Sequence, residues 1–129
     1  MTSNDRVVVI GSGLAGVRLA RRLGELGTPV TLIGEEEHRP YNRVLLAEVL
    51  AGRYSPEVIA LPAPAELTRA RVTGIDRAAR TVTCADGTVV EYGRLVLATG
   101  SNPVLPPLRG LFTADHELPE GVHAFRTMD

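Results

Sequence analysis

The feature that most constrains the fold is a glycine-rich turn between an apolar run and an amphipathic segment. Residues 7–10 read VVVI, a β-branched run that suits a parallel strand covered on both faces. The turn follows at residues 11–16 with the spacing Gly-x-Gly-x-x-Gly. Residues 16–26 then place apolar side chains at helical spacing, with arginines opposite, which predicts an amphipathic helix ended by a glycine. A second apolar run at residues 30–33 completes a strand–helix–strand unit.

The spacing of this turn predicts a phosphate site. Gly11 permits the tight turn, Gly13 lets backbone amides approach a pyrophosphate, and Gly16 lets the helix pack closely on the strand. Free N–H groups and the helix dipole favour an anion at the helix N-terminus. Glu35 follows Gly16 by 19 residues, where a carboxylate can accept the hydroxyl protons of an adenosine ribose. The sequence therefore predicts a dinucleotide site; the alternative is a glycine turn that binds nothing.

The stretch after the second strand distinguishes FAD from NAD as the dinucleotide. An NAD-binding dehydrogenase continues with further helix–strand crossovers. Here residues 71–75, 81–84 and 88–92 alternate like strands around an Asp-Gly turn, and residues 95–98 form one more buried strand. A β-meander used as the crossover is a feature of flavoproteins with two dinucleotides. The predicted fold class is therefore α/β, a Rossmann-like FAD-binding parallel sheet with a β-meander crossover.

The other segments carry weaker patterns. Residues 44–51 (VLLAEVLA) predict a short helix ended by Gly52. Residues 53–64 are rich in proline and are predicted to be irregular. The tail is again proline-rich, and the short run at residues 122–125 predicts a last strand.

Composition excludes several classes of function. A net charge of −1 offers no electrostatic surface for nucleic acid or an anionic membrane. Cys84 is the single cysteine, so the sequence has no internal disulfide and no CxxC pair, and its three histidines are scattered without metal-ligand spacing. The first apolar run is too short to span a membrane, and the residues before it lack the charged and apolar regions of a signal peptide. A cytoplasmic location is expected by default.

Three ordered stretches resemble the N-terminal FAD-binding segment of the FAD-dependent pyridine nucleotide-disulfide oxidoreductase superfamily. They are VVVIGSGLAGVRLARRL (residues 7–23), VTLIGEEEHRPYNRVLLAEVLAG (residues 30–52) and LVLATGSNPVLP (residues 95–106). The large subunit of NAD(P)H-dependent nitrite reductase and the rubredoxin and ferredoxin reductases look most similar. The resemblance implies a glutathione reductase-like FAD domain, incomplete within this chain.

The resemblance also implies FAD contacts. Residues 11–15 match the pyrophosphate turn, and Glu35 with Glu36 match the adenosine-ribose acids. No catalytic residue and no metal ligand is predicted. The predicted cofactor-binding residues are Gly11, Ser12, Gly13, Leu14, Ala15, Gly16, Glu35, Glu36, Arg43, Val72, Ala98, Thr99 and Gly100.

The remaining matches lie farther along the chain. Arg43 matches an arginine that reaches the flavin side of the cofactor, and its guanidinium can hold a phosphate bidentately. Val72 matches a strand residue whose backbone meets the adenine, and residues 98–100 match a turn that passes close to the cofactor. Several ferredoxin reductases carry a lysine near the flavin where this sequence has Glu48, so that feature is not carried over.

The resembled enzymes pass electrons from NAD(P)H through FAD to an acceptor, which is an electron-acceptor protein in part of the family. Residues 1–129 are expected to be a single FAD-binding segment, without the NAD-binding domain and the C-terminal FAD return segment, and inactive alone. NAD(P)H would then bind to that absent domain or to a companion chain. Without a CxxxxC dithiol, a dithiol relay to a disulfide substrate is excluded for this chain.

The sequence also leads to an expectation about self-association and to two alternative functions. Apolar surface left uncovered by the absent segments is expected to favour a homodimer. A stand-alone, non-catalytic module that binds an adenine dinucleotide is the alternative function. An NAD-binding dehydrogenase domain is a third reading, but it needs helical crossovers that the sequence lacks.

Overall fold

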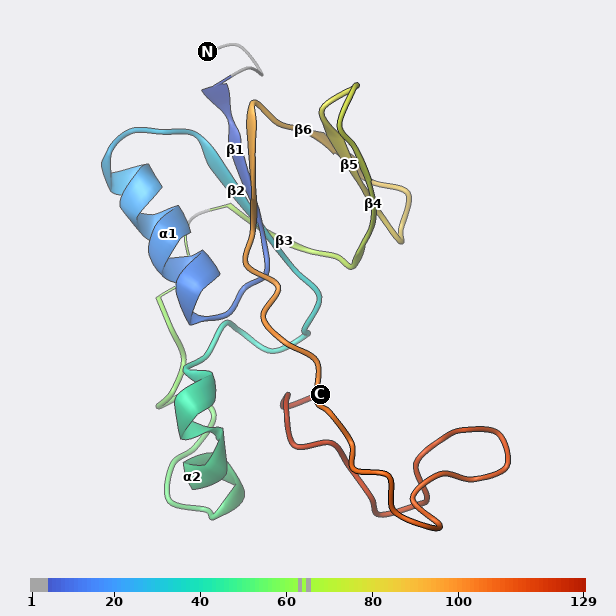
Figure 1. Cartoon of the computed structure of the whole chain (residues 1–129). Helices are drawn as coiled ribbons and strands as arrows, with labels where there is room; N and C mark the ends of the chain where they lie inside the picture. Colours follow the sequence, from blue (N-terminus) through green and yellow to red (C-terminus); the bar gives the residue numbers. More distant parts are fainter. Residues whose placement is uncertain (1–4, 63, 65) are drawn as a thin grey trace.

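The structure, a computed structural model of the chain, describes residues 5–62, 64 and 66–129. Apart from β3, its helices and strands follow the order that the sequence predicts (Figure 1). In chain order they are β1 (Val7–Ile10), α1 (Leu14–Glu25), β2 (Val30–Gly34), a 3-10 turn (Arg43–Leu45), α2 (Leu46–Leu50), β3 (Leu67–Arg69), β4 (Val72–Asp76), β5 (Thr81–Cys84), β6 (Val89–Glu91) and β7 (Arg94–Leu97).

Four strands form a parallel sheet in the order β3-β2-β1-β7. Val7 pairs with Val30 on one side and with Arg94 on the other, so β1 is a central strand. β3 joins the sheet where Leu67 pairs with Leu32; with only three residues, it gives no periodic signal in the sequence. Because the sheet is parallel, the loops that leave the carboxyl ends of β1, β2 and β7 meet at one edge.

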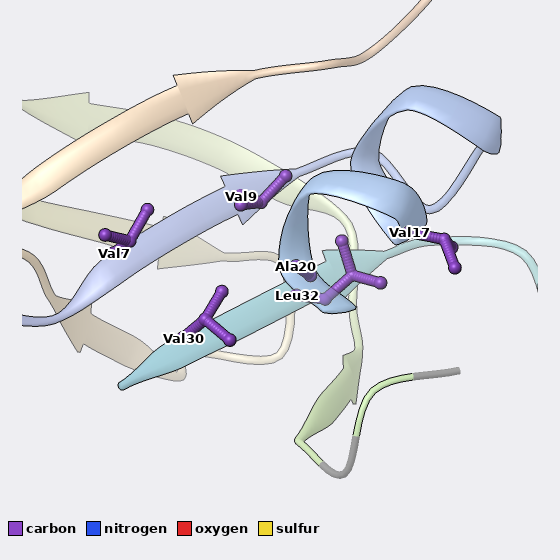
Figure 2. Close-up of a cluster of buried hydrophobic side chains, with 6 residues drawn as sticks. All are labelled: Val7, Val9, Val17, Ala20, Val30 and Leu32. Atoms are coloured by element: carbon purple, nitrogen blue, oxygen red, sulfur yellow. The ribbon is translucent and has the colours of Figure 1, made fainter. Parts of the chain in front are cut away.

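Both faces of the sheet are covered, as the continuous apolar run of β1 predicts. Figure 1 shows α1 against one face and the antiparallel meander β4-β5-β6 against the other. Figure 2 shows the core between α1 and the sheet, which is formed by Val7, Val9, Val17, Ala20, Val30 and Leu32. The core on the meander side is formed by Val8, Ile10, Ile33, Val82 and Cys84. Alternate residues of β1 thus enter two cores, which fixes the position of the turn after Ile10.

The end of α1 confirms the predicted glycine stop. Gly27 has a φ of +76°, a conformation that other residues adopt reluctantly. Its N–H donates to the Gly24 carbonyl, and the N–H of Thr28 donates to the Leu23 carbonyl, each at 2.9 Å. This pair of bonds is the Schellman arrangement, which satisfies the last carbonyls of the helix before β2 begins.

The predicted short helix at residues 44–51 is confirmed in shorter form, as the 3-10 turn and α2. The predicted strand at residues 122–125 is wrong, because the structure has no strand there. The chain bends at both ends of this run: the Val122 N–H donates to the Pro119 carbonyl and the Arg126 N–H to the Ala124 carbonyl, each at 3.0 Å. Between these bends the run cannot extend along the edge of a sheet.

Candidate functional site

A cleft of about 510 Å³ opens at the carboxyl ends of β1, β2 and β7. This is the edge at which open α/β sheets bind their ligands, and the volume suits a cofactor. Every residue that the sequence predicts for cofactor binding lines this cleft, except Gly16. The structure therefore brings together positions that lie up to 89 residues apart in the chain, from Gly11 to Gly100.

The glycine turn after β1 is packed too tightly for side chains. Gly11 has a φ of +110°, and its N–H donates to the Ile33 carbonyl at 2.8 Å. A Cβ atom on Gly11 would lie 2.1 Å from the Ala98 carbonyl oxygen, and one on Gly16 would lie 1.9 Å from the Gly11 carbonyl oxygen. Gly16 thus lies behind the cleft and acts by letting α1 approach the turn.

The N-terminus of α1 faces the cleft without a capping side chain. Gly13 is the N-cap residue in an extended conformation, and the first turn carries no acidic residue. A Cβ on Gly13 would meet no atom within 4 Å, so the space beside it is open. Leu14 and Ala15, which begin the helix, also line the cleft. Free N–H groups at a helix N-terminus, beside an open space, form an anion site that fits a pyrophosphate.

Two adjacent glutamates after β2 line the cleft, and they differ in exposure and in bonding. The Glu35 side chain is 66% exposed, and its closest cationic partner is the Arg71 Nε, 3.8 Å away. The Glu36 side chain is 13% exposed and forms an ion pair with Arg43. Its Oε2 atom also accepts a hydrogen bond from the Tyr41 hydroxyl at 2.6 Å. Glu35 is therefore free to accept ribose hydroxyls, whereas the carboxylate of Glu36 is already bonded on both oxygens.

Arg43 and Glu36 form the other end of the cleft wall, and Tyr41 packs behind them. Arg43 Nη1 donates to the Tyr41 hydroxyl at 2.8 Å, and the guanidinium carbon lies 4.9 Å from the centre of the Tyr41 ring. Burial and the Glu36 carboxylate raise the pKa of Tyr41 to about 12. Burial lowers the pKa of Arg43, but Glu36 and Tyr41 together more than offset this, so the pKa lies above its ordinary value. Arg43 is thus a fixed cation, and Tyr41 is a neutral hydroxyl that packs behind the cleft wall.

The structure adds cleft residues that sequence reasoning missed. Ile10, Ile33, Gly34 and Ala70 lie within two residues of predicted positions and follow from the topology once it is known. Arg71 precedes Val72 and also lines the cleft.

Arg126 is the residue that no local signal indicates. It lies in an irregular tail, yet it lines the cleft and its carbonyl accepts a hydrogen bond from Arg43 Nη1 at 2.7 Å. Its guanidinium lies close to Gly100, where a Cβ would be 2.8 Å from Nη2. The C-terminal segment therefore closes one side of the cleft.

The cleft lining is rich in groups that bind anions and hydroxyls. It contains backbone amides, two carboxylates, three arginines and the hydroxyls of Ser12 and Thr99, and neither cysteine nor histidine. Cys84 is buried in the core on the meander side, where burial raises the pKa of its thiol. Within residues 5–62, 64 and 66–129, no cluster of metal-ligating side chains occurs and no helix has the length and apolarity of a membrane span.

Comparison with known proteins agrees with this geometry. The sequence profile of the pyridine nucleotide-disulphide oxidoreductase family matches residues 5–129. A probable ferredoxin reductase of Castellaniella defragrans is 34% identical over 100% of this chain and 33% of its own length. The assimilatory nitrate reductase electron transfer subunit of Bacillus subtilis is 32% identical over 97% of this chain and 17% of its own length.

The similarity extends to solved structures. Putidaredoxin reductase, in its covalent complex with putidaredoxin, superimposes with a TM-score of 0.72 and 35% identity over 82% of this chain and 28% of that chain. The chain spans about a third or less of the length of the curated relatives it matches. The chain therefore belongs to the pyridine nucleotide-disulphide oxidoreductase family, whose members are oxidoreductases that use FAD and NAD(P)H.

Proposed function

We propose that the cleft binds FAD, with the ADP half of the cofactor along the glycine turn. The observation that carries this proposal is the uncapped N-terminus of α1 beside the exposed carboxylate of Glu35. The helix N-terminus supplies N–H donors and a positive dipole for the pyrophosphate. Glu35 supplies acceptors for the two hydroxyl groups of the adenosine ribose.

The rest of the cleft supports the same orientation of the cofactor. Val72 and Ala70 line the side next to Glu35, where the adenine would lie against backbone and small side chains. Arg43 and residues 98–100 also line the cleft, and the flavin side of the cofactor would lie against them. The guanidinium of Arg43 would then hold the second phosphate of the cofactor.

We propose further that residues 1–129 are the FAD-binding part of an NAD(P)H-dependent oxidoreductase. Bound FAD would accept a hydride from NAD(P)H and pass electrons to an acceptor. Similarity to a ferredoxin reductase, a putidaredoxin reductase and a nitrate reductase electron transfer subunit supports an acceptor protein that carries electrons. NAD(P)H would bind to a domain or companion chain outside these residues, so these residues alone would not turn over.

Exposed apolar side chains on β7 and in the tail support self-association of this segment. Leu97 at the end of β7 is 64% exposed, and Val104 and Leu108 in the tail are exposed as well. Exposed apolar surface favours contact with another protein surface. Sedimentation over a wide concentration range tests this: the proposal expects dimers, and a strict monomer contradicts it.

Absorbance spectroscopy of the purified chain, after incubation with FAD and desalting, tests the proposed cofactor. A retained band near about 450 nm would show that this chain holds oxidised flavin. The absence of any retained flavin, together with no binding of AMP or ADP by calorimetry, would contradict the proposal. Addition of NADH is expected to leave the band unchanged for residues 1–129.

A non-catalytic module that binds an adenine dinucleotide is the second candidate function. The lack of cysteine and histidine in the cleft lining favours it, because the cleft then supplies neither a thiol nucleophile nor an imidazole acid or base. Retention of an adenine dinucleotide other than FAD, with no flavin binding, would favour this module over the reductase segment.

A further inference from the structure

The two acids that line the cleft differ in what their carboxylates are free to do. In Glu36, Oε1 accepts from Arg43 Nη2 and Oε2 accepts from the Tyr41 hydroxyl at 2.6 Å. Turning this carboxylate toward a ribose would break both bonds and leave the buried Tyr41 hydroxyl without its acceptor, which is costly. Glu35 makes only a 3.8 Å approach to Arg71 and is largely exposed.

The bonds around Arg43 leave one defined edge of its guanidinium open. Arg43 Nη2 donates to the Glu36 carboxylate, and Nη1 donates to the Tyr41 hydroxyl, which in turn donates to Glu36. These two acceptors therefore occupy the edge between the two terminal nitrogens. Nη1 donates its second N–H to the Arg126 carbonyl at 2.7 Å. A guanidinium has five N–H donors. Among the described residues these contacts use three of Arg43's donors, and they leave Nε–H and the second N–H of Nη2.

We propose that Glu36 is a positioning residue, which orients Arg43 so that its Nε–Nη2 edge binds the second phosphate of the dinucleotide, while Glu35 alone serves as the ribose acid. This inference rests on the proposed function, because both ligand groups belong to the bound dinucleotide. The open edge has two parallel donors, the geometry that matches two oxygens of a phosphate. Burial of the Glu36 carboxylate and of the Tyr41 ring restricts the rotation of the guanidinium.

The first test uses AMP and ADP as probes, since ADP adds the phosphate that Arg43 is expected to bind. Calorimetry is carried out in about 0.3 M salt, so that the general effect of removing one negative charge is screened. Glu36→Gln is expected to leave AMP affinity within about twofold and to weaken ADP affinity about fivefold to tenfold. The matched variant Glu35→Gln is expected to weaken AMP and ADP by the same factor.

A double-mutant cycle tests whether Glu36 acts through Arg43. In an Arg43→Gln background, the substitution Glu36→Gln is expected to leave ADP affinity unchanged, because the group that it positions is gone. An equal loss of ADP affinity in both backgrounds would overturn the proposal. So would a loss of AMP affinity in Glu36→Gln as large as that in Glu35→Gln, because Glu36 would then contact the ribose itself.

A measurement without ligand tests the positioning role of Glu36 independently of whether the cleft binds a dinucleotide. With ¹⁵N-labelled arginine, the Nη1 and Nη2 signals of Arg43 are expected to be distinct in the wild type and to merge by rotation in Glu36→Gln. Merged signals in the wild type, or distinct signals in both proteins, would overturn the positioning role. If neither AMP nor ADP binds the wild type, the proposed function is wrong, and the arginine spectrum still decides whether Glu36 orients Arg43.

Discussion

The two ends of the cleft are built in different ways. The adenosine end consists mainly of backbone from β1, α1 and β2, which are neighbours in sequence and share one buried core, with the exposed Glu35 side chain beside it. The flavin end consists of side chains from separate segments: Glu36 and Arg43 in the loop after β2, and Arg126 in the tail. The first end is fixed by the packing of regular elements, whereas the second depends on hydrogen bonds and ion pairs between loops.

This difference predicts which substitutions act through folding and which act through binding. Added side-chain atoms at the tightly packed glycines of the adenosine end, Gly11 and Gly16, disturb close backbone contacts and should reduce stability strongly, whereas the exposed Glu35 should act on binding alone. Changes at the flavin end remove individual polar contacts, each of which contributes modestly to stability.

Gly16→Ala is expected to have the largest effect. Its Cβ would lie 1.9 Å from the Gly11 carbonyl oxygen, and backbone at this position cannot give way, so a loss of about 3 kcal/mol or more in the free energy of unfolding is expected. Urea denaturation followed by far-ultraviolet circular dichroism measures it. Gly13→Ala is the matched control, with a change within about 1 kcal/mol, because its Cβ meets no atom within 4 Å. Equal stability of the two variants would contradict the close approach.

Tyr41→Phe tests the flavin end. The hydroxyl bonds Glu36, Arg43 and the Met128 N–H, so its loss is expected to lower stability by about 1–2 kcal/mol at neutral pH. Tyr54→Phe, at an exposed position, is the control and should have little effect.

The same hydroxyl predicts a pH dependence at alkaline pH. The folded pKa of Tyr41 is raised to about 12, while an unfolded tyrosine titrates near about 10. The stabilisation that the neutral phenol contributes is therefore complete below about pH 10 and is lost as the pH rises toward about 12. The urea midpoint of the wild type should fall more steeply across this window than that of Tyr41→Phe. Parallel curves for the two proteins would contradict the raised pKa.

Glu35→Gln affects binding at the adenosine end without disturbing the fold. Its side chain is largely exposed, so stability should change by less than about 0.5 kcal/mol. Affinity for AMP, ADP and FAD is expected to fall by the same factor, about tenfold, since all three share the ribose. A change in FAD affinity alone, measured by calorimetry, would assign Glu35 to the flavin end.

Gly24→Ala is expected to have the smallest effect and the opposite sign. This position is helical in α1, and a Cβ there would meet no atom within 4 Å. Alanine should stabilise the protein by about 0.5 kcal/mol and leave ligand affinity unchanged. A destabilisation in the same urea titration would show that the end of α1 is packed more closely than the structure indicates.

The contrast between the ends also explains what the sequence could predict. The local pattern of apolar residues predicts β1, α1 and β2. The alternation of apolar and polar residues around the Asp-Gly turn predicts the meander. β3 was not predicted because its three residues follow a proline-rich stretch without a pattern of their own. The strand predicted at residues 122–125 is wrong because hydrogen-bonded bends at both of its ends override a short apolar run.

The candidate site divides in the same way. The spacing from Gly11 to Gly16, with an acid after the second strand, is a local signal that identifies the positions of the adenosine end. Arg126 reaches the cleft only through tertiary contacts with Arg43 and Gly100, which no spacing in the sequence reveals. Likewise, the sequence of the adjacent Glu35 and Glu36 does not predict that Glu36 pairs with Arg43 while Glu35 stays exposed.

The most direct test of the central claim is an amide NMR titration of the ¹⁵N-labelled chain with ADP. The largest shifts are expected at residues 11–15 and at Glu35, because the pyrophosphate would lie at the N-terminus of α1 and the ribose beside the acid. Shifts confined to the outer face of α1, or none at millimolar ADP, would contradict a dinucleotide site in this cleft.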